Sequence, residues 1–383
     1  MLGIFHRDRF GRPQIIAILF LLAFLFQGLW VLHHVPLAAD ELALIRAGRA
    51  QWRSGIPAGN AVHSPLAALA ASAPLLFETG AAGAAGPPLP LRWLARLPFV
   101  FCSLMLAGSL WYVARRLYGN PGGYIALALY CFAPLAVVHA ARVDAAAPAA
   151  WGLFGSLFTA IALAHTLYAP PRDRLRRALL LGVALGMGVG AEYSVALVIP
   201  LLLALVFYLS PRRRKEALAL LGLSGAIVLL LLWSSYFFGP VALLQGLQSA
   251  HVLALRPALV AGGIAYRALV PFLVGHLPAM LLLALALYTL LRSPRSRYFG
   301  NIVPILAASP LFLASLSTPY YLSVHYLVLA LPFLALFIAG VFADLLEEAY
   351  EGPSARLARR VLLTALFAHA ALGLWMLPQL AGT

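Results

Sequence analysis

The sequence predicts an all-α integral membrane protein, a polytopic bundle of about eleven transmembrane helices with interfacial helices in its first outer loop. Of its 383 residues, 63% are hydrophobic and 10% are charged, whereas soluble domains have about 45–50% apolar and about 25% charged residues. The apolar residues also form long unbroken runs, such as 14–32, 215–233 and 326–343. A helix needs about 20 apolar residues to cross the hydrocarbon core.

Short basic clusters separate the apolar runs and predict which side of the membrane each loop occupies. The net charge of +15 comes mainly from arginines between these runs. The clusters are Arg7, Arg9 and Arg12; Arg115 and Arg116; Arg172, Arg174, Arg176 and Arg177; Arg212, Arg213, Arg214 and Lys215; Arg292, Arg295 and Arg297; and Arg356, Arg359 and Arg360. This is the positive-inside pattern, and it argues against a nucleic-acid partner.

Short polar segments mark the boundaries of the predicted helices. HRDRFGRP precedes the first run, RRLYGNP separates the second from the third, and PPRDRLRR follows the fourth. The turn GAEYS separates the fifth from the sixth, SPRRRK precedes the seventh, RSPRSR follows the eighth, and EEAYEGPSARLARR precedes the eleventh. We therefore expect helices at about 14–35, 96–114, 122–140, 146–168, 178–191, 193–210, 216–236, 269–291, 301–317, 326–345 and 361–379.

The alternation of these helices predicts the topology. The N-terminus is expected in the cytoplasm and the C-terminus outside, in the inner (plasma) membrane, with residues 1–383 forming a single membrane domain. The first extracytoplasmic loop covers 36–95 and the second covers 237–268. The first apolar run is too long for a signal peptide and lacks a small-residue cleavage site, so we interpret it as an uncleaved helix.

The first outer loop contains two predicted interfacial helices. PLAALAASAPLLF is too short to span the membrane comfortably and is bounded by proline. The other begins at Asp40, in DELALIRAGRAQW, where Arg46, Arg49 and Arg53 share one helical stripe. An amphipathic helix of this kind lies at the membrane surface.

The acidic residues outside the cytoplasmic segments are candidates for function. Five of the 12 acids map to the outer face: Asp40, Glu41, Glu78, Asp144 and Glu192. Asp40 has two interpretations. It is either the N-cap of an interfacial helix, or a general base toward an acceptor hydroxyl or amine. In the second case, nearby arginines would hold an anionic leaving group such as a lipid phosphate.

Several cationic residues lie at the predicted level of these acids. Arg46, His63 and Arg142 belong to the first outer loop and to the segment that carries Asp144. Arg256 and Arg267 lie in the second outer loop, either as headgroup-facing residues or as phosphate contacts. Glu192 either pairs with an outer arginine or belongs to the site. No zinc-like spacing of cysteine and histidine occurs, so no metal site is assigned.

A series of motifs carries a family resemblance. After the acidic pair come HSPL, LARLPFVFCSLM, YCFAPLAVVHAARVD, LLLGVALGMGVGAEYSVALVIPLLL and HYLVLALPFLALF. In this order they resemble GT-C type glycosyltransferases that use polyprenyl-phosphate-sugars, the glycosyltransferase family 39 group of aminoarabinose transferases and protein O-mannosyltransferases. The resemblance covers most of residues 14–345.

This resemblance implies a fold, a reaction and roles for individual residues. The fold is a multi-helix bundle that moves a sugar from a polyprenyl phosphate to a lipid or protein acceptor on the extracytoplasmic side, usually with inversion. Asp40 corresponds to the first-loop acid, the base, and Glu41 to its neighbour. Asp144 corresponds to the second-loop acid, which supports the site or a bound divalent cation. His325 and Tyr326 occupy the late donor-binding position.

One departure keeps a second function open. Relatives often carry a lysine where this chain has Glu192. The alternative is a catalytically degenerate protein on the same fold, which serves as a structural subunit of a membrane complex and has membrane-protein partners.

Overall fold

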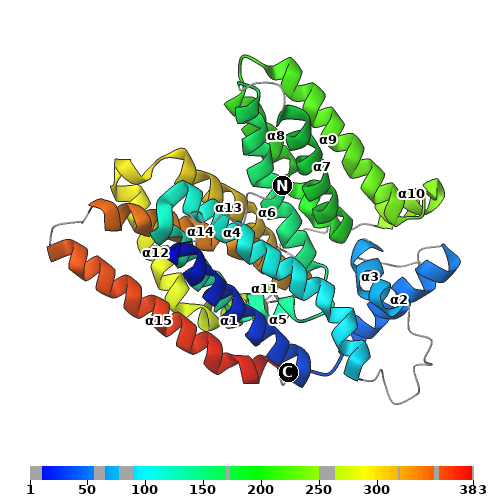
Figure 1. Ribbon diagram of the computed structural model, residues 1–383, viewed down its shortest axis with the longest axis horizontal. Helices are drawn as coiled ribbons and strands as arrows, with labels where there is room; N and C mark the ends of the chain where they lie inside the picture. Colours follow the sequence, from blue (N-terminus) through cyan, green and yellow to red (C-terminus); the bar gives the residue numbers. More distant parts are fainter. Residues whose placement is uncertain are drawn as a thin grey trace. The chain divides into compact units, whose positions relative to one another are not determined.

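The computed structural model describes residues 11–55, 65–76, 89–168, 173–249, 264–317, 320–348 and 353–381. Within those ranges the regular structure is helical throughout (Figure 1), which confirms the predicted all-α fold class. The chain divides into two compact units. Unit 1 combines Met1–His34, Leu104–Val138 and Pro257–Thr383, and unit 2 combines Val35–Ser103 and His139–Arg256. The single domain over 1–383 stays a prediction.

Unit 2 contains the segment predicted as the first outer loop and the middle of the chain. Its elements are α2 (Ala39–Ser54), α3 (Pro65–Ser72), η3 (Ala73–Leu75), the first part of α4 (Leu89–Cys131), α6 (Ala146–Thr166), α7 (Arg174–Ala191), η5 (Tyr193–Val198), α8 (Ile199–Leu209), α9 (Arg214–Ser235) and α10 (Pro240–Ser249).

Unit 1 contains the first helix and the C-terminal part of the chain. Its elements are α1 (Arg12–His34), the second part of α4, most of α5 (Pro134–Ala140), α11 (Ile264–Gly275), α12 (Leu277–Arg292), η6 (Pro294–Ser296), α13 (Phe299–Ser317), α14 (Tyr320–Glu348) and α15 (Pro353–Ala381).

The apolar helices make this a multi-pass membrane protein. Six described helices are long and apolar enough to cross a membrane, namely Arg12–His34, Arg92–Cys131, Ala146–Thr166, Arg214–Ser235, Val324–Glu347 and Arg359–Gln379. The bent pair Leu269–Gly275 and Leu277–Arg292, with an angle of 91°, would make a seventh. Described helices overlap all of the predicted spans, but the count of eleven is not confirmed, because segments such as Tyr193–Leu209 and Phe299–Ser315 are shorter.

The predicted second and third helices meet at a kink in α4. Gly119 has φ 72° and ψ −172° inside α4, so two helices join there. A residue with a side chain rarely adopts such a backbone conformation. The predicted helix over 122–140 is in fact divided, because α4 ends at Cys131 and the short α5 begins at Pro134. Proline cannot donate the backbone hydrogen bond that would continue the helix.

Small residues allow close packing in unit 2, where α6, α7 and α9 lie side by side (Figure 1). A methyl group at Gly182 would lie 2.8 Å from Ile227 Cβ, and one at Gly186 would lie 2.7 Å from Leu231 Cδ1. Both contacts are on α9, and on the other side of α7 the backbone of Gly188 meets Gly152 of α6. The glycine-rich pattern in α7 therefore serves helix packing, as the sequence suggests.

The helix predicted to begin at Asp40 is α2, and it packs on α3. Glu41, Ile45, Gly48 and Gln51 form its buried face. A side chain at Gly48 would collide with the Ala68 carbonyl and the Ser72 hydroxyl of α3. Gln51 Nε2 also donates to the Ser235 carbonyl at the end of α9, at 2.8 Å. The amphipathic helix is therefore fixed to its own unit on one face.

Candidate active site

The candidate site stands on a small apolar core in unit 2. Its members come from α2, α3, η3, the first part of α4, and the segment around the start of α6. They are Ile45, Ala67, Ala71, Leu75, Ala95, Phe99, Val143, Ala145 and Ala147. Most are alanines, so the backbones of these elements approach closely and hold the adjacent polar residues in place.

A fully buried ion pair joins α2 to α4. Arg96 Nε donates to Glu41 Oε1 at 2.9 Å, and Arg96 Nη2 donates to Glu41 Oε2 at 2.6 Å. The side chains are 0% and 1% exposed. This is the two-pronged arrangement in which a guanidinium matches a carboxylate best. Burial of two charges is costly unless their remaining hydrogen-bonding groups are also satisfied.

Backbone groups satisfy the remaining hydrogen-bonding groups of Arg96 and Glu41. Arg96 also donates to the carbonyls of Val35 and Pro36, at 2.8 and 3.0 Å. Glu41 accepts hydrogen bonds from Ala38 N at 2.9 Å and from Val143 N at 2.7 Å. One ion pair therefore ties together the α1–α2 connection, the start of α2, α4, and the segment before α6. Glu41 has the environment of a positioning residue.

Asp40 lies directly beside this pair and remains exposed. Its Oδ1 accepts a hydrogen bond from Glu41 N at 2.9 Å. The interpretation of Asp40 as the N-cap is wrong, because Ala38 occupies that position and α2 begins at Ala39. Glu41 accepts the Ala38 N–H, which leaves Asp40 in the first turn as an accessible carboxylate.

Asp144 is held on the segment that Glu41 reaches. Its Oδ1 accepts a hydrogen bond from Ala146 N at 3.0 Å, at the start of α6. Its Oδ2 pairs with Nδ1 of His139, at the end of α5. Because Val143 N bonds to Glu41, the backbones that carry Asp40 and Asp144 are linked through a single side chain. A common catalytic site for Asp40 and Asp144 stays a prediction that rests on this backbone link.

The remaining predicted residues fall in three groups. Arg46 is exposed on α2 and Arg142 is half-buried beside Val143. His63 and Arg256 lie outside the described residues, and only the backbone of Arg267 is described, in α11. His325 and Tyr326 lie in α14 of unit 1, where Tyr326 is buried.

Glu192 is buried at the turn between α7 and η5. Its extended backbone, with φ −148° and ψ 121°, ends α7. Ser194 Oγ donates to Glu192 Oε1 at 2.8 Å.

Two residues at the site were not predicted as members of it. Arg96 belongs to the motif LARLPFVFCSLM, and a lone arginine within an apolar run was the available signal, because such a charge needs a buried partner. His139 stands five residues before Asp144, a spacing that no local pattern marks as a contact. The bend between α5 and α6 brings the two together.

The described residues contain no group of three or more histidine, cysteine, aspartate or glutamate side chains placed to hold a metal ion. Asp144 and His139 form a pair. They would supply two ligands to a divalent cation, and the described structure adds no third.

Comparisons with known proteins agree with this architecture. Residues 91–237, which contain Arg96, Asp144 and Glu192, match a family model described as dolichyl-phosphate-mannose-protein mannosyltransferase. No curated protein sequence matches the chain.

Solved structures match over nearly the whole chain. ArnT from Cupriavidus metallidurans bound to undecaprenyl phosphate aligns with a TM-score of 0.69 and 17% identity, over 97% of this chain and 77% of that one. The apo oligosaccharyltransferase from Archaeoglobus fulgidus aligns with a TM-score of 0.64 and 11% identity, over 96% of this chain and 56% of that one. AglB from the same organism, in complex with an inhibitory peptide and a dolichol-phosphate, has a TM-score of 0.61 and 12% identity, over 94% and 55%.

These matches define the class of protein. The chain has the GT-C glycosyltransferase fold, a membrane-embedded helical bundle. The resemblance drawn from the order of its motifs is confirmed at that level.

Proposed function

We propose that the protein is a membrane glycosyltransferase that moves a sugar from a polyprenyl-phosphate donor to a lipid or protein acceptor on the extracytoplasmic side. The observation that carries this proposal is the link from Glu41 to Val143, which joins the segments of Asp40 and Asp144. The bacterial relative holds undecaprenyl phosphate and the archaeal one a dolichol-phosphate, which supports a polyprenyl phosphate as the lipid part of the donor.

The proposed reaction is a single displacement at the anomeric carbon. The acceptor oxygen or nitrogen attacks that carbon as its bond to the phosphate oxygen breaks, and the configuration inverts. Asp40, exposed beside the rigid ion pair, takes the acceptor proton. The polyprenyl phosphate leaves with the bonding electrons. Asp144, oriented by His139, supports the site or holds a divalent cation there.

Cationic residues would stabilise the phosphate as its charge develops. Arg46 and Arg142 lie in the same unit as Asp40 and are its first candidate partners. The further proposed contacts are His63, Arg256, Arg267, His325 and Tyr326.

A test that does not require the sugar or the acceptor to be known uses the membranes of the source cell. Purified protein added to these solubilised membranes, which supply the donor and both lipid and protein acceptors, should consume polyprenyl-phospho-sugar and release polyprenyl phosphate, measured by mass spectrometry. Heat-denatured protein is the control. A folded protein that leaves the donor pool unchanged would overturn the enzyme proposal and favour the structural-subunit alternative.

The sidedness of the proposal is tested separately by cysteine labelling. Cys102 and Cys131 are the two cysteines, and both are free thiols that can be replaced by alanine. In that background, Gly59→Cys should react with an impermeant maleimide added from outside intact cells. Arg212→Cys, at an exposed position beyond α8, should react only after the cells are permeabilised. The reverse pattern would invert the topology.

A further inference from the structure

Unit 1 contains a large apolar groove whose lining includes none of the residues of the candidate site. Its volume is about 1010 Å³, at the upper end of the roughly 300–1,000 Å³ common for ligand pockets. Residues from α1, from α4 and the turn after it, and from α14 and α15 line it, among them Phe20, Pro121, Phe132, Leu346, Arg359 and Phe367. Arg359 is the charged side chain among them.

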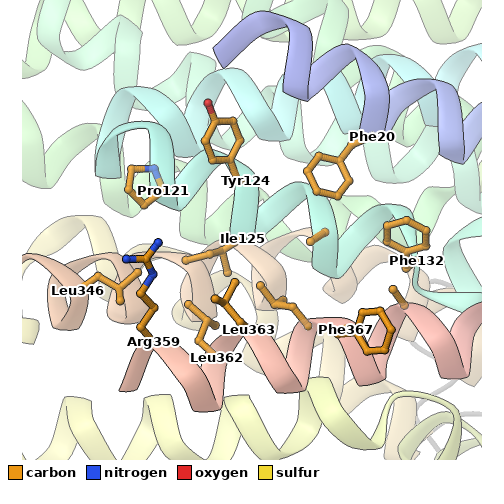
Figure 2. A pocket seen from close by; sticks show the side chains of 13 residues that line it. Phe20, Pro121, Tyr124, Ile125, Phe132, Leu346, Arg359, Leu362, Leu363 and Phe367 are labelled. Carbon is orange, nitrogen blue, oxygen red and sulfur yellow. The ribbon is translucent and has the colours of Figure 1, made fainter. Parts of the chain in front are cut away.

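The groove has a polar end and an apolar end. Figure 2 shows the guanidinium of Arg359 near Leu346 and Pro121, whereas Phe20, Phe132 and Phe367 lie toward the other end. Arg359 is also the first residue of the candidate span Arg359–Gln379. The charge therefore stands where α15 enters the membrane, and the apolar part of the groove runs inward from it.

The length of the groove along α15 matches one leaflet. Its lining residues on this helix recur every three to four positions from Arg359 to Ala370. At 1.5 Å per residue these positions span roughly 16 Å, about half of the ~30 Å hydrocarbon core. An acyl chain of one leaflet ends at that depth, whereas a transmembrane helix of a partner would continue past it.

The polar end of the groove indicates which kind of lipid headgroup binds there. An acyl chain gains little by leaving the bilayer for a groove, because lipid tails are as apolar as leucine side chains. Selectivity must therefore come from the headgroup. Arginine binds phosphate through a planar fork of donors, and basic pockets between transmembrane helices on the cytoplasmic side bind anionic lipid headgroups. Arg359 belongs to a basic cluster that the sequence places on that side.

We propose that this groove binds an anionic phospholipid of the leaflet that α15 enters at Arg359, with the lipid phosphate on Arg359 and an acyl chain along Leu362, Leu366 and Ala370. This inference is independent of the proposed transfer reaction. It concerns unit 1 alone, and its readout is bound lipid rather than activity.

The test compares lipids retained by the whole protein. Protein released from nanodiscs of equal parts phosphatidylglycerol and phosphatidylcholine is analysed by native mass spectrometry. Wild type should retain phosphatidylglycerol preferentially. Arg359→Gln should lower that preference about tenfold, as expected for loss of one charge-assisted contact. Arg359 and Arg360 are both exposed, but only Arg359 lines the groove, so Arg360→Gln should leave the preference unchanged within about twofold.

A second pair of variants tests the groove itself. Ala370→Phe fills its inner end and should reduce retention of both lipids, whereas Ala371→Phe adds the same ring at an exposed position and should not. Equal effects of Arg359→Gln and Arg360→Gln would overturn the proposal, since they indicate surface attraction. Full lipid retention in Ala370→Phe would also overturn it, because the acyl chain would then not occupy the groove. Displacement of the lipid by inorganic phosphate alone would do the same, because the chain would then add nothing to binding.

Discussion

Replacing Glu41 with glutamine should lower the free energy of unfolding by about 3–5 kcal/mol, the loss expected when one partner of a buried ion pair is removed. Four donors converge on the two carboxylate oxygens of Glu41: Arg96 Nε, Arg96 Nη2, Ala38 N and Val143 N. Glutamine keeps one oxygen and turns the other acceptor into a donor. The buried guanidinium then loses its counter-charge, and at least one backbone N–H loses its acceptor.

The control is an ion pair at the surface. Glu216 contacts Arg174 and Arg213, and its side chain is 46% exposed. Glu216→Gln should cost less than about 1 kcal/mol, because water screens the pair and rehydrates the arginines. Denaturant titration in mixed micelles, followed by circular dichroism, measures both variants. A Glu41→Gln protein as stable as Glu216→Gln would contradict the role assigned to the Glu41–Arg96 pair.

The double variant separates the ion pair from the backbone contacts. Arg96→Met alone leaves Glu41 as an unpaired buried charge, whereas Glu41→Gln with Arg96→Met leaves no charge at all. The double variant should be more stable than the sum of the single losses predicts, by roughly 0.5–3 kcal/mol. Strict additivity would mean that Ala38 N and Val143 N, and not Arg96, account for the cost.

The sequence predicts the fold well where its signal is local. Apolar runs and arginine clusters place helices over every expected span, and the glycines at 182 and 186 indicate the packing of α7 before any partner is known. The helix at 39–54 is visible from its amphipathic pattern. The division of the chain into two units is not visible, because both are built from segments far apart in sequence.

The sequence predicts which residue types belong to the candidate site, but not which of them contact one another. Asp40, Glu41 and Asp144 follow from position, since acids near membrane-helix ends are rare and costly. Which of the adjacent acids is buried cannot be read from the sequence. It depends on Arg96, which lies 55 residues from Glu41 and meets it only after α2 packs on α4. The structure therefore divides the acidic pair into an anchored carboxylate and an accessible one.

That division makes Asp40 the residue whose loss should affect the proposed reaction most. Asp40→Asn keeps an oxygen that can accept the Glu41 N–H and leaves the Glu41–Arg96 pair untouched. The fold should persist, while the group that takes the acceptor proton is lost. Removing a general base typically costs about 10²–10⁴-fold in rate, so release of polyprenyl phosphate from the donor should fall by that factor.

The matched control is Asp173→Asn, because Asp173 is an exposed aspartate at the start of α7, on the side predicted to be cytoplasmic. It should retain the wild-type rate. The unfolding free energies of both variants should stay within about 0.5 kcal/mol of wild type, as for surface substitutions in general. Two outcomes would remove Asp40 from the mechanism: full activity in Asp40→Asn, or a loss of activity that tracks a loss of stability. In either case the proton must go to another group, and Asp144, oriented by His139, is the carboxylate that the geometry offers next.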